Sequence, residues 1–314
     1  MILPRTPAAL GAASAIIAVF CFSINDVVIK FVSGDYPLHE VVLVRSLVGL
    51  VALTAIIVPI SGWGVLRTRR LGMHLLRGGC VVFANMCFFL GLAALPLAEG
   101  VAIFFVSPLI ITVFSVIFLR ETVGPWRWAA VAIGLVGVAI ILRPGTEAFR
   151  PAALLPIAAA FGYATLHILT RHIGRTETTA AMSFWIQVTF VLVSAVFGLA
   201  LGHGGFAGST DPSLSFLLRG WVWPTGTDFG LFALTGLASA AGGFFISHAY
   251  RTSEAALVAP FEYIALPLSV LWGFTVFGEV PDAIAWAGMA LILASGLFMI
   301  WREARVPETP RYRR

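Results

Sequence analysis

The chain has 314 residues, of which 59% are hydrophobic and only 11% are charged, and its mean hydropathy is +0.96. A soluble domain carries roughly 25% charged residues, so this composition excludes a water-soluble globular protein. The net charge of +5 does not require a nucleic-acid partner, because membrane proteins accumulate arginine on one side of the bilayer. The three cysteines fall inside apolar segments without paired spacing, so they predict neither disulfides nor a metal site.

Apolar runs of about 17–25 residues follow one another along the chain, and each is long enough to cross a bilayer as a helix. The first run is too long for a signal peptide and lacks a convincing small-residue cleavage site, so we expect it to remain as a helix. The prediction is an all-α membrane protein with ten transmembrane helices. These lie near residues 8–32, 38–60, 73–95, 97–119, 126–142, 151–172, 179–201, 228–250, 254–277 and 282–302.

The arginines orient these predicted helices. If the N-terminus is cytoplasmic, the cytoplasmic segments hold most of the 20 Lys and Arg residues, including the stretch 67–77 and the tail 311–314. Because positive charge accumulates on the cytoplasmic side, both termini are predicted to be cytoplasmic. The tail, residues 305–314, is expected to lie beside anionic lipid.

Residues 88–143 and 244–302 carry one pattern twice. Each copy has a Phe pair, an apolar stretch broken by a proline, a Glu followed by a Trp seven residues later, and a last apolar segment with a Gly. The matching residues are Phe88 and Phe244, Pro108 and Pro267, Glu121 and Glu279, Trp128 and Trp286, and Gly137 and Gly296.

Each half of the chain contains five predicted spans. An odd number forces the second half to enter the membrane upside down, which gives two inverted five-helix repeats, the hallmark of many secondary transporters. The predicted units are residues 1–146, residues 147–304 and the basic tail 305–314. The long loop 202–227 between two spans is predicted to be a surface loop rather than a lid.

Two segments, PLAEGVAIFFVSP at 96–108 and VAPFEYIALP at 258–267, resemble the drug/metabolite transporter superfamily, as does Phe277-Gly278-Glu279. More narrowly, the chain resembles its ten-helix EamA family. The resemblance implies a carrier in the bacterial inner membrane with cytoplasmic termini and a central cavity lined by helices one, three, four, six, eight and nine. Members of the family export amino acids and other metabolites, and some relatives take up nucleosides, vitamins or S-adenosylmethionine.

Charged groups inside spans are costly and are therefore candidates for function. Asp26 and Lys30 share a helix face at spacing i, i+4. They predict either an ion pair or, at Lys30, a cation that meets a substrate carboxylate or phosphate. Arg45 lies well inside the second predicted helix and needs an acid partner, for which Asp26, Asp35 and Glu40 are candidates.

Glu262 is the strongest candidate for a residue that acts in transport. It lies inside the ninth predicted helix between Pro260 and Pro267, which remove backbone donors and loosen the helix. The matching position in the first half, near Ile103, is apolar. Glu262 is therefore expected to bind a substrate amine, to exchange a proton during coupling, or to hold a kink through hydrogen bonds.

Other groups inside the spans could orient a substrate. His167 and His248 are expected either to bond to a neighbouring helix or to join proton coupling. The remaining candidates are hydrogen-bonding side chains and aromatic groups for an apolar wall. They are Asn85, Tyr163, Gln187 and Tyr263, and Phe88, Phe105, Trp185, Phe244 and Phe261.

The repeated residues are expected to be structural. Glu121 and Glu279 precede the fifth and tenth predicted helices and are expected to interact with helix N-termini. Pro108, Pro260 and Pro267 are expected to shape broken helices.

No enzyme motif, cofactor motif or nucleotide-binding domain is present in the sequence, so we expect a carrier that is not an enzyme. The leading hypothesis is alternating access by a monomer or homodimer that exports amino acids or related small metabolites across the bilayer. The alternatives are uptake of a vitamin, nucleoside or S-adenosylmethionine, and a non-transporting membrane sensor or scaffold.

Overall fold

The computed structural model describes residues 7–120, 122–174, 176–253 and 258–303. In these ranges every regular element is a helix. The elements are α1 (Pro7–Val32), α2 (Leu38–Ser61), η1 (Trp63–Leu66), α3 (Leu71–Ala94), α4 (Leu97–Phe104), α5 (Ser107–Leu119), α6 (Pro125–Leu142), η2 (Pro151–Ala153), α7 (Leu154–Ile173), α8 (Thr179–Leu201), α9 (Pro212–Leu218), α10 (Gly226–Thr252), η3 (Ala259–Ile264), α12 (Ala265–Phe277) and α13 (Ala283–Glu303).

The apolar runs of the sequence form the long helices. Within the described ranges, eight helical stretches are long and apolar enough to cross a membrane. The last two predicted spans correspond to the shorter apolar helices Phe261–Phe277 and Ala283–Phe298. The protein is therefore an all-helical, multi-pass membrane protein, because such runs cannot leave their backbone groups unpaired in lipid.

Two of the predicted spans are broken rather than continuous. The fourth span divides into α4 and α5 at Phe105 and Val106, and the ninth continues from the 3₁₀ segment η3 into α12. Pro108 and Pro267 both lie in the first turn of the continuing helix, where a missing N–H costs little. Pro260 belongs to η3, but the structure describes only its backbone. Glu121 lies outside the described residues.

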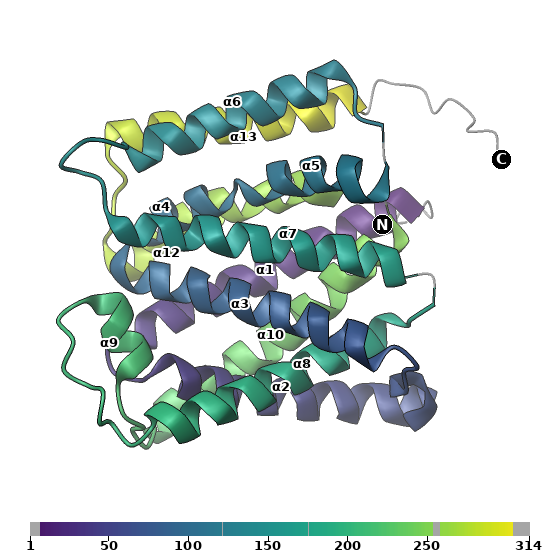
Figure 1. The fold of residues 1–314 in the computed structure, drawn as a ribbon, viewed down its shortest axis with the longest axis vertical. Coiled ribbons are helices and arrows are strands. Elements are labelled where there is room, and N and C mark those ends of the chain that lie inside the picture. Colours follow the sequence, from purple (N-terminus) through teal and green to yellow (C-terminus); the bar gives the residue numbers. More distant parts are fainter. Residues whose placement is uncertain (1–6, 121, 175, 254–257, 304–314) are drawn as a thin grey trace.

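The helices run roughly parallel or antiparallel to one another, and α6 and α13 form a pair along one edge of the bundle (Figure 1). These two helices approach closely through glycine. A Cβ atom added to Gly137 would lie 2.8 Å from the carbonyl oxygen of Gly288, and one added to Gly288 would lie 2.7 Å from the carbonyl oxygen of Gly137. Small residues at such a crossing let two membrane helices pack backbone against backbone.

The first turn of α1 and the last turn of α13 lie at one end of the bundle, and α9 lies at the other (Figure 1). We call this second end the α9 end. The long loop predicted at 202–227 contains α9, which Asp211 caps by accepting a hydrogen bond from the Leu214 amide at 2.9 Å. The loop folds back onto α3, where the Ser213 hydroxyl donates to the Leu90 carbonyl at 2.7 Å.

Candidate functional site

A large cavity opens inside the bundle, and its empty space is about 1170 Å³ with the solvent at its mouth included. Its walls come from α1, α3, α4, α7, α10 and the η3–α12 segment, the elements that the family resemblance implied. Two further helices, α2 and α8, also contribute through Arg45, Gln187 and Phe190 among others.

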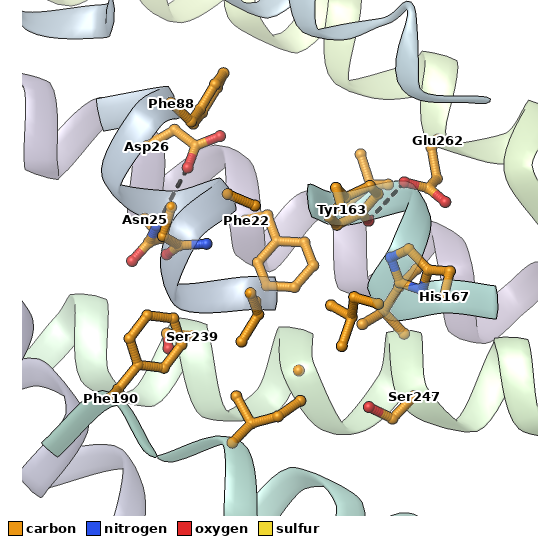
Figure 2. Close-up of a pocket in the computed structure, with 18 of the residues that line it drawn as sticks. Phe22, Asn25, Asp26, Phe88, Tyr163, His167, Phe190, Ser239, Ser247 and Glu262 are labelled. Carbon is orange, nitrogen blue, oxygen red and sulfur yellow. Dashed lines mark hydrogen bonds between the residues drawn. The ribbon is translucent and has the colours of Figure 1, made fainter. Parts of the chain in front are cut away.

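One side of the cavity is built around Glu262. This carboxylate is buried and accepts a hydrogen bond from the Tyr163 hydroxyl at 2.7 Å (Figure 2). It accepts a second one from the Tyr250 hydroxyl. His167 lies between the two tyrosine rings, with its ring centroid 4.1 Å from that of Tyr163 and 3.9 Å from that of Tyr250. We call Tyr163, His167, Tyr250 and Glu262 the acidic cluster.

The opposite side is built around Arg45, which is only 1% exposed. Its two terminal nitrogens donate to the side-chain oxygens of Asn25 at 2.8 Å and Asn85 at 2.7 Å. The guanidinium also lies 5.4 Å from the ring centroid of Phe89 and 5.0 Å from that of Phe190, distances at which a cation is attracted by a ring face. Such partners are required, because a buried charge without them is very costly.

Asp26 completes this side of the cavity. Its carboxylate accepts a hydrogen bond from the Asn25 amide at 3.1 Å (Figure 2). The cavity is thus lined by two acids, the half-buried Asp26 and the buried Glu262, and by two buried arginines, Arg45 and Arg77. The formal charges of these four groups cancel.

Aromatic rings form much of the remaining wall. Phe88 and Phe104 pack with ring centroids 4.9 Å apart, and Phe104 in turn contacts Tyr163 at 5.2 Å. Phe22, Phe105 and Phe190 also line the cavity. An apolar wall of aromatic rings suits a ligand with an aromatic ring system.

The structure brings most of the predicted polar residues together and separates others. Nine of the candidates line the cavity: Asp26, Arg45, Asn85, Phe88, Phe105, Tyr163, His167, Gln187 and Glu262. Six others among the described residues do not: Lys30, Trp185, Phe244, His248, Phe261 and Tyr263.

These six residues have other surroundings. Tyr263 is buried against Phe105, with ring centroids 5.1 Å apart. Trp185 donates its indole N–H to the Leu66 carbonyl at 3.2 Å, next to η1. Phe244 packs against Phe245, Phe261 is half-buried beside the core, and His248 is half-buried on α10.

Lys30 does not pair with Asp26, although the i, i+4 spacing favoured that pair. Its ammonium lies 3.0 Å from Glu279 Oε1 and also donates to the Leu95 carbonyl. Glu279 Oε2 accepts from the Leu97 amide at 2.7 Å, so this acid caps α4 rather than the helix that follows it. The reason is tertiary packing, which places the α12–α13 turn against the start of α4.

Two residues that belong to the site, Arg77 in the cavity wall and Tyr250 behind it as a partner of Glu262, did not emerge from the sequence. Arg77 was counted with the cytoplasmic arginines, but it is 1% exposed and donates to the Thr170 hydroxyl at 3.0 Å. Its depth inside the third apolar run was the available signal. Tyr250 lies near the end of α10, and no local pattern marks it as a partner of Glu262.

Comparison with known proteins places this architecture in a family. The model of the EamA-like transporter family matches residues 9–143. A riboflavin transporter of Rhizobium johnstonii is 34% identical over 79% of this chain and 76% of its own length. A riboflavin transporter of Vibrio cholerae is 30% identical over 94% of each chain. The chain belongs to the EamA-like transporter family.

More distant relatives extend the family. An S-adenosylmethionine uptake transporter of Rickettsia prowazekii is 26% identical over 90% of each chain. A protein of known crystal structure has the same fold, with a TM-score of 0.69 at 18% identity over 94% of this chain and 99% of its own. The family model and the two riboflavin transporters confirm the resemblance to the EamA family.

Proposed function

We propose that this transporter takes up a flat, uncharged, heteroatom-rich aromatic vitamin of the riboflavin type and moves it through the central cavity by alternating access. The observation that carries the proposal is an aromatic-walled cavity whose polar groups stand on two opposing sides and whose formal charges cancel. The two riboflavin transporters that cover most of the chain support this substrate class.

The charge balance favours a neutral substrate. Arg45 and Glu262 are hydrogen-bonded to neutral side chains of the protein, and the formal charges of the four ionisable groups Asp26, Arg45, Arg77 and Glu262 in the wall cancel, so an uncharged ligand can enter without a charged partner of its own. A free amino acid carries two opposite charges and would need two such partners when it leaves water. Amino-acid export, the leading hypothesis from the sequence, is therefore less well supported than its alternative, vitamin uptake.

Alternating access rests on a proposed architecture of ten spans in two inverted repeats, residues 1–146 and 147–304. Its support is the pair of broken spans, α4–α5 and η3–α12, each with a proline in the first turn of its second part. Broken helices that line a site at the interface of two repeats are typical of secondary transporters. The arginine distribution favours a bacterial inner membrane location with both termini cytoplasmic.

Uptake of radiolabelled riboflavin into a riboflavin-auxotrophic bacterium that expresses the protein tests the proposal. We expect saturable uptake that purified protein in liposomes reproduces. The matched control is Leu199→Ala, because Leu199 is 86% exposed and does not line the cavity. Saturable efflux of an amino acid without any riboflavin uptake would overturn the proposal.

A further inference from the structure

We infer that Arg45 and Gln187 together form hydrogen bonds with one edge of the substrate. On this edge a hydrogen-bond acceptor lies next to a donor, as the carbonyl and N–H do in a cyclic amide or imide. The inference rests on the proposed function and makes it more specific. It follows from two buried polar atoms in the cavity wall that have no partner among the described residues.

Arg45 supplies the donor. Its terminal nitrogens are engaged by Asn25 and Asn85, on α1 and α3. Its Nε is buried and has no acceptor within the described part of the chain. Because the asparagines and the rings of Phe89 and Phe190 hold the guanidinium, the Nε–H bond has a fixed direction before any ligand arrives.

Gln187 supplies the acceptor. This residue is 3% exposed, and its amide nitrogen donates to the Ser239 hydroxyl at 3.4 Å. Its Oε1 is buried and receives no hydrogen bond from any described residue. A buried carbonyl oxygen without a donor is unfavourable, so a ligand N–H that reaches it restores a lost hydrogen bond.

Two contacts bring these atoms to the same part of the cavity. Phe190 lies one helical turn after Gln187 on α8, and its ring is one of the two that the Arg45 guanidinium contacts. Gly49 lies one turn after Arg45 on α2, and a Cβ atom added there would lie 2.8 Å from Gln187 Nε2. Arg45 and Gln187 therefore lie about one helical turn apart along the α2–α8 interface. Phe190 and Ser239, which mark this place in Figure 2, lie across the cavity from Glu262.

The protein offers a donor, the Arg45 Nε–H, and an acceptor, Gln187 Oε1. A ligand edge that carries an acceptor next to a donor is complementary to this pair. The pyrimidinedione ring of a flavin presents this edge through a carbonyl oxygen and the neighbouring imide N–H. The rest of the planar ring would then extend along the aromatic wall towards the acidic cluster. Sites that hydrogen-bond a substrate group reject analogues without it much more strongly than apolar pockets reject a missing methylene.

Competition for riboflavin uptake by the full-length protein in liposomes tests the inference. The blocked analogue is riboflavin methylated at the imide nitrogen, and the matched control analogue carries chlorine in place of the two methyl groups on the far ring. We expect the methylated analogue to compete about tenfold more weakly than riboflavin, which corresponds to one lost hydrogen bond. The chlorinated analogue is expected to compete within about twofold of riboflavin, because its imide edge is intact.

Variants of Gln187 assign the effect to this residue. Gln187→Leu removes the acceptor, so riboflavin and its methylated analogue are expected to compete equally, whereas Gln187→Glu keeps an acceptor oxygen and should retain the preference. Equal competition by the two compounds in the unmodified protein would overturn the inference while leaving riboflavin transport intact. The base edge of adenosine also carries an acceptor next to a donor. If adenosine competes and the chlorinated analogue does not, the pyrimidinedione assignment is overturned. Absence of riboflavin uptake would instead overturn the proposed function.

Discussion

The Lys30 ammonium lies 3.0 Å from the Glu279 carboxylate and joins the first half of the chain to the second. Both side chains are mostly shielded, with 11% and 27% of their surfaces exposed. Through the additional hydrogen bonds to the Leu95 carbonyl and the Leu97 amide, the pair ties α1, the α3–α4 turn and the α12–α13 turn together. It thus links three elements at the α9 end of the bundle.

This pair predicts strong coupling between two substitutions. Lys30→Met leaves Glu279 without its cation and is expected to cost about 1–3 kcal/mol, because the remaining charge is only partly solvated. Adding Glu279→Gln should recover part of this loss, since the neutral amide no longer requires a cation. Thermal unfolding of the two single variants and the double variant in detergent measures the coupling. Strictly additive effects would show that the pair contributes nothing.

In the acidic cluster, we expect riboflavin uptake to depend on the hydroxyls of Tyr163 and Tyr250 but not on the hydroxyl of the nearby Tyr263. Tyr163→Phe and Tyr250→Phe each remove one donor to Glu262, so each is expected to reduce riboflavin uptake about tenfold, which corresponds to one buried hydrogen bond. Tyr263→Phe is the matched control, because the Tyr263 hydroxyl is buried without a partner among the described residues. Its uptake should stay within about twofold of the unmodified protein. A comparable loss in all three variants would contradict this role for Glu262.

The α6–α13 crossing predicts a steric effect. Gly137→Ala would place a Cβ atom 2.8 Å from both the Gly288 carbonyl oxygen and Ile292 Cγ1, so the helices must separate at a cost of about 1–3 kcal/mol. Gly79→Ala on α3 is the control, because a Cβ atom there meets nothing within 4 Å. That change should be neutral or stabilising by about 0.5–1 kcal/mol. Thermal unfolding compares the two, and equal stability would refute the close crossing.

A pH effect is expected at the α9 end, where Arg143 and Asp282 lie just outside the spans. Hydrogen bonds from Arg143 hold the pKa of the Asp282 carboxyl below its ordinary value, with a further contribution from the Ala285 amide. A lowered pKa means that the stabilisation is present above the unfolded-state pKa of about 4 and is lost as pH falls through the folded-state value. The melting temperature should therefore decline between about pH 5 and pH 3 more steeply in the unmodified protein than in Asp282→Asn. Parallel profiles would show that the pair does not contribute.

The sequence predicted the helices well because the membrane leaves few choices. A run of apolar residues long enough to cross lipid must pair its backbone internally, so composition alone indicates a helix. The positions of Pro108 and Pro267 likewise indicated where two spans are broken. Asp26, Arg45 and Glu262 could be singled out because a charged group within an apolar run is costly to place in the membrane, which makes it a candidate for function.

What the sequence by itself determined was therefore the class of protein, its helices and the costly groups inside them. The tertiary structure decided which of those groups meet. Glu262 lies 99 residues from Tyr163 in the chain, and Lys30 pairs with a carboxylate in the other half rather than with its neighbour on the same helix face. Arg77, which was counted with the cytoplasmic arginines from its place in the sequence, is enclosed by α7 and α8. Partners of this kind depend on how helices pack, and packing is set by side-chain shape across the whole bundle rather than by any local pattern.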